Sequence, residues 1–301
     1  MAWGSRTGAT RSKGGDTAVN LICVHGGVSG REREEVPSLE RSRRAGLEAA
    51  TALDAVEAAV CNLEDNPALN AGLGSVLNRR GQIELDAGLA DGTAGRFAGV
   101  AGVPVRHPIS LARRVLEDTP HVLLFGEAAT QVAEGVERLE RSTPEQHERW
   151  ARAEASGELR LDRYGDSEHV DTVGAVVVDG AGHIAAGSST GGVFGQMPGR
   201  IGDSPIFGAG IYASAEVAVV GTGVGELFLE TLACFRAGEL VEKGLDPQSA
   251  CERVIGYLGG VKSLEAGLLA IDGKGRVGAA YRGGSWAVEG PEGPLTPKRL
   301  P

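Results

Sequence analysis

VVVDGAGHIAA, at residues 176–186, is matched further along the chain by LAIDGKGRVGA, at residues 269–279. Each segment is an apolar run, an Asp-Gly turn and a second apolar run, a pattern that predicts a β-hairpin. Between the two hairpins the sequence predicts two helices, one over Gly225–Ala237 and one that begins at Asp246-Pro247. Because the helices are grouped between hairpins and do not alternate singly with strands, we expect an α+β layered fold.

Before residue 140 the hydrophobic pattern alternates between the period of a strand and that of a helix. It predicts strands over 19–24, 83–86 and 121–125, and helices over 51–65, 108–116 and 127–139. Residues 140–167 are crowded with Arg, Glu and Asp and contain few aliphatic side chains. We interpret them as an exposed linker that precedes the first hairpin.

The composition describes a glycine-rich globular chain with an aliphatic core. Hydrophobic residues make up 42% of the 301 residues, aromatic residues only 4%, and glycine, at 47 residues, is roughly twice as frequent as the ~7% average. This length allows one large domain or two small ones and is ample for a hydrophobic core. The formal net charge of −10 argues against nucleic acid or an anionic membrane as the main partner.

The sequence shows neither a targeting signal nor a membrane-spanning run. Residues 1–18 are polar, so we expect a flexible tail, and no apolar run approaches the ~18 residues that a membrane helix needs. Cys23, Cys61, Cys234 and Cys251 lie far apart in apolar contexts, without a CxxC pair. We therefore expect buried free thiols in a cytoplasmic protein and no zinc site.

Two other candidate sites carry little information by themselves. The glycine-rich stretches lack the phosphate-binding pattern GxxxxGK[ST], so a nucleotide site has no support from them. His25, which precedes Gly26-Gly27, is open between a structural and a catalytic role.

Asp171-Thr172-Val173-Gly174 joins the charged linker to a strongly apolar strand. A threonine at such a junction is by default the first residue of the strand. The alternative is an N-terminal nucleophile, in which cleavage before Thr172 frees its α-amine. An α-amine has a pKa of ~7.7–8.0, so it can act as the base for the hydroxyl of the same residue.

Motifs on both sides of this junction decide between the two interpretations. They are LEDNP at 63–67, NAGLG at 70–74, SSTGG at 188–192, GRIGDSP at 199–205 and GTGVGE at 221–226. With these motifs in this order, the chain from about Val19 to Val288 resembles the plant-type asparaginases and isoaspartyl aminopeptidases. That family belongs to the N-terminal-nucleophile hydrolases and is related to glycosylasparaginase.

The resemblance implies an enzyme that cleaves itself between Asp171 and Thr172. The implied fold is a four-layer αββα sandwich of two antiparallel sheets, one domain that cleavage divides into two subunits. Residues 19–171 would form the first subunit, with a linker at about 140–170, and residues 172–301 the second, with a tail from about residue 289. The implied reaction is hydrolysis of L-asparagine and β-aspartyl dipeptides through a β-aspartyl ester of Thr172, with no required cofactor.

The resemblance also assigns catalytic roles to particular residues. Thr172 is the nucleophile, Thr190 lies beside its amine and Asn70 helps to hold it. Thr222 and the backbone N–H of Gly223 form the oxyanion hole, where the loss of one donor commonly costs ~10²–10³ in rate.

Substrate recognition is assigned to three further residues. Arg200 would bind the α-carboxylate of the substrate, because a guanidinium binds carboxylates bidentately. Asp203 would accept its α-ammonium group, and Gly225 would line the same pocket. Taken without the other motifs, Arg200 and Asp203 are better described as a surface ion pair beside a turn.

Two alternatives for the function stay open. Asp171 stands where the asparaginase branch usually has glycine and where the glycosylasparaginases have aspartate. Hydrolysis of N-glycosylated asparagine is therefore the nearest enzymatic alternative. From a different class, the chain could be a binder of aspartate-like ligands that neither processes itself nor catalyses.

The resemblance further implies a homodimer of processed protomers that acts on a small-molecule substrate, and a bound monovalent cation, usually sodium. The cation ligands would be backbone carbonyl oxygens, which suit a hard ion. They would come from Leu63, Glu64, Asn66, Leu69, Ala71 and Leu73.

Overall fold

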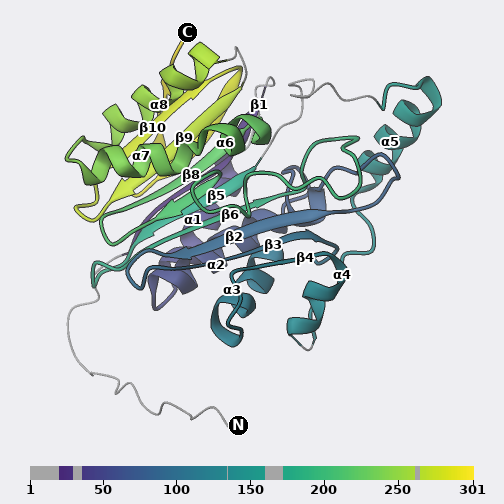
Figure 1. Cartoon of the computed structure of the whole chain (residues 1–301), viewed down its shortest axis with the longest axis horizontal. Coiled ribbons are helices and arrows are strands. Elements are labelled where there is room, and N and C mark those ends of the chain that lie inside the picture. The colour runs from purple at the N-terminus through teal and green to yellow at the C-terminus, as the bar shows by residue number, and fades with distance from the viewer. Residues whose placement is uncertain (1–19, 30–35, 134, 160–171, 262–264) are drawn as a thin grey trace.

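The computed structural model describes residues 20–29, 36–133, 135–159, 172–261 and 265–301, and it has two β-sheets that lie between layers of helices (Figure 1). The larger sheet contains, in spatial order, β12 (Gly293–Leu295), β11 (Ser285–Gly290), β1 (Leu21–Ser29), β5 (Val173–Val178), β6 (Ile184–Thr190), β2 (Leu85–Asp91), β3 (Arg96–Val103) and β4 (Leu123–Phe125). The smaller sheet contains β13 (Lys298–Arg299), β10 (Val277–Arg282), β9 (Ala266–Asp272), β8 (Val217–Gly223) and β7 (Ile211–Ala213). Neighbouring strands are antiparallel except in the pairs β3–β4 and β10–β13.

Each sheet carries helices on its outer face. The larger sheet is covered by α1 (Val36–Leu47), α2 (Ala52–Glu64) and α3 (Pro108–Asp118), and the smaller sheet by α6 (Gly225–Thr231), α7 (Ala233–Glu242) and α8 (Pro247–Val261). Shorter elements are the 3-10 turns η1 (Gly72–Gly74) and η2 (Thr130–Val132) and the helix α4 (Gly126–Ala129). Helix α1 was not predicted from the sequence, whereas the layering of helices on sheets was expected.

The central strands are buried on both faces, so alternate residues enter different cores. In β1, Ile22 and Val24 pack against the helices, whereas Cys23 packs between the two sheets. In β5, Val177 and Val176 divide in the same way. A strand that is buried on both faces has a continuous apolar sequence. The two sheets with helices on their outer faces confirm the α+β layered fold that we expected.

The two predicted hairpins are confirmed and use the same turn chemistry. β5 pairs with β6 and β9 pairs with β10, both antiparallel. The Asp179 N–H donates to the His183 carbonyl at 2.9 Å, and Asp179 Oδ1 accepts from the His183 N–H at 2.9 Å. Asp272 makes the same pair of bonds with Arg276, at 3.0 and 2.9 Å. The repeated Asp-Gly motif marks a repeated local structure.

The helix predicted over 127–139 is wrong beyond its first turns. Helical structure ends with η2, and Gly135 has a φ of +76°, which a continuing helix cannot accommodate. Arg138 then forms a β-bridge with Val105, and the Leu139 N–H donates to the Pro104 carbonyl at 3.0 Å. The backbone of this segment is thus held by the chain before α3.

The segment interpreted as a linker contains a helix, α5 (Pro144–Ser156), that the sequence analysis missed. Thr143 caps its start, Pro144 occupies its first turn, and Gly157 ends it with a φ of +74°. The helix is largely exposed, but Trp150 Nε1 donates to the Asn78 carbonyl at 3.0 Å. The capping residues Thr143 and Gly157 were the available signal for this helix.

Residues 1–19 and 160–171, which include the expected tail and Asp171, lie outside the described residues.

The helix expected over Gly225–Ala237 is divided at Leu232, whose φ of +51° is unusual for a residue other than glycine. The break lets α7 begin against the loop before β7, where the Cys234 and Phe235 N–H groups donate to the Ala209 and Gly208 carbonyls at 3.2 and 2.9 Å. At the C-terminus, the tail expected from about residue 289 instead supplies the edge strands β12 and β13.

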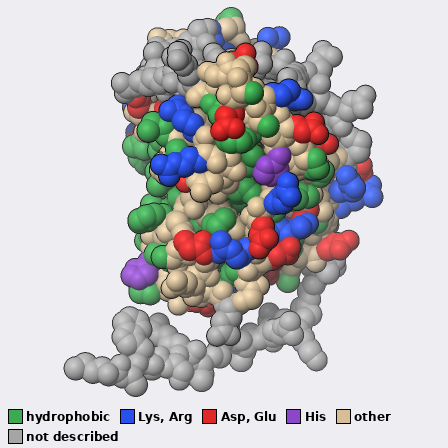
Figure 2. All heavy atoms as spheres, turned by 90° about the vertical axis from the view of Figure 1, so that its right-hand side faces the viewer, with side chains coloured by type: hydrophobic (Ala, Val, Ile, Leu, Met, Phe, Trp, Pro, Cys, Tyr) green, Lys and Arg blue, Asp and Glu red, His purple; other side chains and the backbone are tan. Residues whose placement is uncertain are grey.

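The remaining expectations concern cysteines, charge and membranes. All four cysteines are free, but Cys61 is only partly buried, whereas the other three are buried. On the face shown in Figure 2, basic and acidic side chains are interspersed. Among the described residues, none of the helices is both long and apolar enough to cross a bilayer.

Candidate active site

Thr172, Thr190 and Thr222 meet between the two sheets. Thr172 directly precedes β5 and is 3% exposed. The β5–β6 register pairs Val173 with Ser189, so Thr172 and Thr190 are the next positions along the two strands. The backbone N–H of Thr172 donates to Thr222 Oγ1, on β8 of the other sheet, at 3.4 Å. The structure therefore brings together three threonines that are far apart in the sequence.

Thr222 is oriented by backbone groups at the end of β8. Its Oγ1 also accepts from the Val28 N–H at 3.3 Å, so both acceptor positions of the hydroxyl are used and its own proton is left to donate. Gly223 follows with a φ of +132°, and a side chain there would collide with the Glu265 carbonyl oxygen. This bend requires glycine and leads the chain from β8 directly into α6.

Asn70 ties the loop after α2 to the segment that follows Thr190. Its Nδ2 donates to the Gly192 carbonyl at 2.7 Å, and its Oδ1 accepts from the Val76 N–H at 3.0 Å. The Gly191 N–H donates to the Asn70 carbonyl at 2.8 Å. Asn70 thus holds the chain directly after β6, and its role in holding the nucleophile stays a prediction.

Arg200 and Asp203 converge on Gly225, the first residue of α6. A Cβ built on Gly225 would lie 2.7 Å from Arg200 Nη2 and 2.8 Å from Asp203 Oδ1. Arg200 also makes two bonds of 3.0 Å to Glu226, through Nε and Nη2. These bonds use two of the five N–H donors of the guanidinium. The others stay available to a second carboxylate.

Asp203 has the chemistry of a site for a cation. Its side chain is buried, and its Oδ2 has no hydrogen-bond partner among the described residues. Burial raises the pKa of Asp203 to about 7, although the nearby Arg200 acts in the opposite direction. A buried carboxylate oxygen without a donor costs free energy, so a bound ammonium group would satisfy it.

Asp86 and Glu84, which the sequence predicted only as part of a strand, hold the loop that carries Arg200. Asp86 Oδ2 accepts from the Gly202 N–H at 2.8 Å, and Asp86 Oδ1 accepts from the Gly102 N–H at 2.8 Å. Two residues earlier, Glu84 Oε1 accepts from the Gly199 N–H at 2.9 Å. The two carboxylates therefore hold both ends of the loop that carries Arg200. Acidic residues within an apolar strand segment were the available signal.

Asp86 also connects the two halves of the site, since its backbone pairs with Thr190 between β2 and β6. The threonine cluster and the Arg200 loop are thus joined through one residue. Burial raises the pKa of Asp86 to about 6.

His25 belongs to the core beside this site. It is fully buried, stacks edge-on against Trp286 with ring centroids 5.6 Å apart, and pairs in register with Gly174. Burial lowers the pKa of His25 to about 3, so the ring is neutral at physiological pH. We interpret His25 as a packing residue.

The loop proposed for a monovalent cation is compact and rich in backbone oxygens. A Cβ on Gly72 would lie 2.5 Å from the Glu64 carbonyl oxygen and 2.9 Å from that of Arg106. The carbonyls of Leu63, Asn66 and Leu69 each accept one backbone hydrogen bond, which leaves each a second lone pair. These oxygens fit a hard cation in donor type.

Comparison with known proteins identifies the family of this chain. The sequence profile of the family described as asparaginase matches residues 21–288. An isoaspartyl peptidase of Salmonella typhimurium is 41% identical over 87% of this chain and 91% of its own length. A plant-type L-asparaginase of Pyrococcus abyssi is 41% identical over 86% of this chain and 92% of its own, and an isoaspartyl peptidase of Escherichia coli is 39% identical over 87% and 89%. With this match over most of its length, the chain belongs to the asparaginase family that includes the isoaspartyl peptidases and the plant-type L-asparaginases.

Proposed function

We propose that this chain is a self-processing amidohydrolase that cleaves L-asparagine and β-aspartyl dipeptides. The observation that carries the proposal is the meeting of Thr172, Thr190 and Thr222 close to the place where Arg200 and Asp203 converge on Gly225. The names of its relatives, isoaspartyl peptidase and plant-type L-asparaginase, support the same reaction class.

Processing begins at the bond before Thr172. The Thr172 hydroxyl adds to the carbonyl carbon of Asp171, the C–N bond breaks and the nitrogen takes the proton, so that an ester replaces the amide. Water then hydrolyses this ester, leaving a carboxylate on Asp171 and a free amine and hydroxyl on Thr172. The Thr172 nitrogen already lies 3.4 Å from Thr222 Oγ1, so the new amine would form next to the oxyanion donor.

Turnover uses the same hydroxyl in two steps. The Thr172 amine accepts the hydroxyl proton as Oγ1 attacks the side-chain carbonyl carbon of the substrate. The Thr222 hydroxyl and the Gly223 N–H stabilise the negative charge on the carbonyl oxygen. The leaving nitrogen takes the proton and departs as ammonia or an amino acid. Water then hydrolyses the β-aspartyl ester and releases aspartate.

Specificity for a substrate with a free amino-acid end follows from Arg200 and Asp203. The open N–H donors of Arg200 bind the α-carboxylate, and the unpartnered oxygen of Asp203 accepts the α-ammonium group. An internal peptide residue has neither charged group. It would leave Asp203 without a partner in a buried site.

The intact mass of the purified protein tests the proposal. We expect two chains that begin at the N-terminus and at Thr172, and a single uncleaved chain for Thr172→Ala, with activity lower by at least about 10⁴-fold. The control Thr130→Ala, at a half-buried threonine outside the site, should process normally. Wild-type protein that stays a single chain, or a Thr172→Ala variant that hydrolyses asparagine, would refute the proposal.

Substrate competition separates this function from its alternatives. We expect hydrolysis of β-aspartyl-leucine and of asparagine to exceed that of N-glycosylated asparagine. Faster hydrolysis of the glycosylated substrate would assign the chain to the glycosylasparaginase reaction. Thermal stabilisation by aspartate without turnover of any of them would identify a non-catalytic binder.

We propose three further properties of the processed enzyme. Sodium binds the backbone oxygens of residues 63–73, so sodium chloride should raise the melting temperature more than choline chloride does.

The enzyme is a homodimer, because Phe125, Val122 and Leu123 expose 74%, 57% and 42% of their surface at and next to β4. Sedimentation should therefore give twice the protomer mass. The free thiols agree with a cytoplasmic enzyme, which cell fractionation would test.

A further inference from the structure

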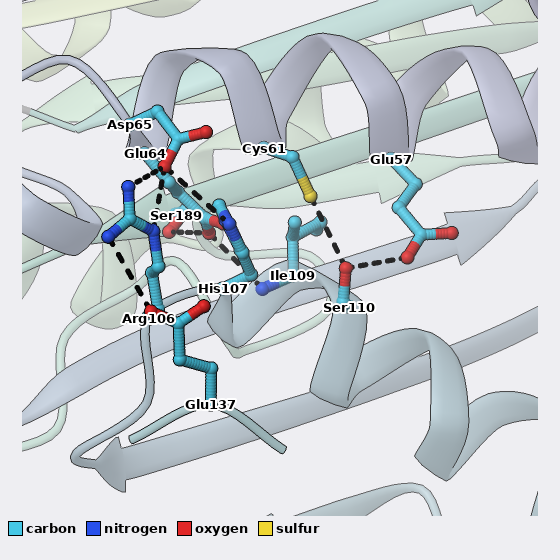
Figure 3. A network of polar contacts seen from close by, with 10 residues as sticks. All are labelled: Glu57, Cys61, Glu64, Asp65, Arg106, His107, Ile109, Ser110, Glu137 and Ser189. Atoms are coloured by element: carbon cyan, nitrogen blue, oxygen red, sulfur yellow. Dashed lines mark hydrogen bonds and ion pairs between the residues drawn. The ribbon is translucent and has the colours of Figure 1, made fainter. Parts of the chain in front are cut away.

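A second cluster of reactive side chains lies where α2 ends and α3 begins, outside the threonine site (Figure 3). Cys61 and Glu64 are three residues apart in the last turn of α2, so they share one face of that helix. His107 is the residue before α3. The thiol sulfur, a carboxylate oxygen and a ring nitrogen of these residues all lie within 4.8 Å of one another.

The spacing of these atoms is close to that of metal ligands. In tetrahedral zinc sites the ligand bonds of about 2.0–2.3 Å place neighbouring ligands about 3.3–3.6 Å apart. His107 Nδ1 lies 3.2 Å from Glu64 Oε2, so a metal ion can replace the proton that these two atoms now share. The sulfur of Cys61, which is partly buried, lies within 4.8 Å of both atoms, so a rotation of its side chain can bring it closer to them.

The surroundings hold two of the three side chains in place. Glu64 Oε1 accepts from Ser189 Oγ at 2.6 Å and from the Ile109 N–H at 3.1 Å, which leaves Oε2 directed at His107. The other ring nitrogen of the histidine, Nε2, faces Asp65 Oδ1 at 3.6 Å. A carboxylate behind the second nitrogen is the usual support of a metal-bound histidine, because it sets the tautomer and raises the basicity of the ring.

One of the three side chains, His107, also faces a cavity. A cavity of about 330 Å³ is lined by His107 and Ser110, by Glu57 of α2 and by residues 135–137. Ser110 Oγ lies 3.3 Å from the sulfur of Cys61. The cavity provides a path for a hydrated ion and room for a water as fourth ligand, both of which a metal site needs.

We propose that Cys61, Glu64 and His107 form a binding site for a borderline divalent metal ion such as Zn²⁺. On binding, the thiol proton of Cys61 and any proton on His107 pass to the solvent, and the thiolate together with the Glu64 carboxylate balances the charge of the ion. A sulfur, nitrogen and oxygen set selects zinc-like ions over sodium. The site is therefore distinct in chemistry from the backbone oxygens of residues 63–73.

The ion would cross-link α2 to α3 immediately before the loop that carries Asn70. No zinc site was expected from the sequence, because its cysteines and histidines are not closely spaced along the chain. Here the fold brings Cys61 and His107 together from distant positions in the chain.

Cd²⁺ titration of the full chain tests the proposal, because cadmium bound to a thiolate gives a charge-transfer absorption in the ultraviolet. Sodium is held constant and saturating throughout, so that any site at residues 63–73 stays unchanged. We expect one equivalent of Cd²⁺ to produce the band, and one equivalent of Zn²⁺ to abolish it by competition. Zn²⁺ should also raise the melting temperature.

Variants identify the ligands. Cys61→Ala should lose the band, and His107→Asn, which keeps a good helix-capping residue, should weaken Cd²⁺ binding at least about tenfold. The control His183→Asn removes a comparable histidine, whose Nδ1 lies 3.0 Å from Asp179 Oδ2, and should bind as the wild type does. A wild type without the band, or a band unchanged in both Cys61→Ala and His107→Asn, would overturn the proposal. If Cys61→Ala does not fold, the His107→Asn titration still decides.

Discussion

Three carboxylates and one guanidinium lie together in the pocket of this chain. Asp86, Asp203 and Glu226 all act electrostatically on Arg200. Burial raises the pKa of Asp203 to about 7 and that of Asp86 to about 6, and the neighbouring carboxylates add to this effect. A substrate that brings an ammonium group supplies the missing positive charge. At the scale of the residue, the site is therefore destabilised by charge until the substrate binds.

Asp203→Asn should separate stability from binding. Because the folded-state pKa is raised above the usual 3.8 to about 7, the native state holds a proton that the unfolded chain releases. The stability that this proton contributes is present at low pH and is lost as pH rises toward 7. We expect the variant to be more stable than the wild type at pH 8, by on the order of 1 kcal/mol or more.

Thermal unfolding at several pH values measures this difference, which should shrink as the pH is lowered toward 4. The KM for asparagine should rise strongly in the variant, and in the wild type it should rise as the pH falls below 7. A variant that is less stable than the wild type at pH 8 would contradict the assignment.

Asp86→Asn should act on substrate affinity through the Arg200 loop. One amide oxygen cannot accept from both Gly202 and Gly102, as the two carboxylate oxygens do. A lost hydrogen bond to a charged group costs about 1.5–3 kcal/mol, so we expect KM to rise about tenfold or more, with a smaller change in kcat.

Steady-state kinetics give the split between KM and kcat, and intact mass should show that processing is unaffected. Asp91→Asn, at the other end of the same strand, where Asp91 pairs with Arg96, is the matched control and should leave both constants unchanged. An equal loss in kcat for Asp86→Asn would argue against a positioning role.

At the scale of the element, the start of α6 decides the shape of the pocket. β8 ends at Gly223 and α6 begins at Gly225, so two glycines follow Thr222 where the chain approaches Arg200 and Asp203. Gly223 is required by its backbone conformation and Gly225 by the approach of side chains. Two glycines of the same sequence motif are thus required for different physical reasons.

Gly225→Ala should damage binding without unfolding the protein. The new Cβ would meet Arg200 Nη2 at 2.7 Å and Asp203 Oδ1 at 2.8 Å, and both atoms belong to side chains that can move away. We expect KM to rise about tenfold or more and the melting temperature to change little. Gly256→Ala in α8 is the control, because nothing lies within 4 Å of its Cβ, and it should stabilise the protein by about 0.5–1 kcal/mol. Kinetics and thermal unfolding of both variants check this, and an unchanged KM for Gly225→Ala would refute the placement of the pocket.

At the scale of the whole molecule, the two halves on either side of Thr172 are interleaved. β5, which follows Thr172, lies between β1 of the first half and β6, and β6 pairs with β2 of the first half. The core between the sheets contains Cys23 and Ala90 together with Val176, Leu269 and Ile271. Neither half can bury its strands alone.

The processed enzyme should therefore unfold as one unit. Calorimetry is expected to show a single cooperative transition with both chains present, and the chains should elute together from a sizing column. Residues 1–171 and 172–301 expressed separately should lack native circular dichroism, and mixing them after refolding should restore it. Two separate transitions would show that the halves are independent domains.

Local signals in the sequence predicted the elements with mixed success, for physical reasons that can be named. The hairpins at 176–186 and 269–279 were predicted correctly because each Asp-Gly turn is stabilised within itself. The segment 127–139 was predicted wrongly because its backbone bonds go to Val105 and Pro104. Helix α5 was missed because charge composition outweighed the capping signals of Thr143 and Gly157.

The sequence by itself determined the layered fold class, the order of the motifs and the threonine at the junction, because these depend on residues close together in the chain. Only the tertiary structure decided the strand order, the convergence of Arg200 and Asp203 on Gly225, and the place of Asp86 between the two clusters. The meeting of Cys61 with His107 belongs to the same group. Such contacts join residues far apart in sequence, and they form because strands and helices bury their apolar faces against partners that no local pattern specifies.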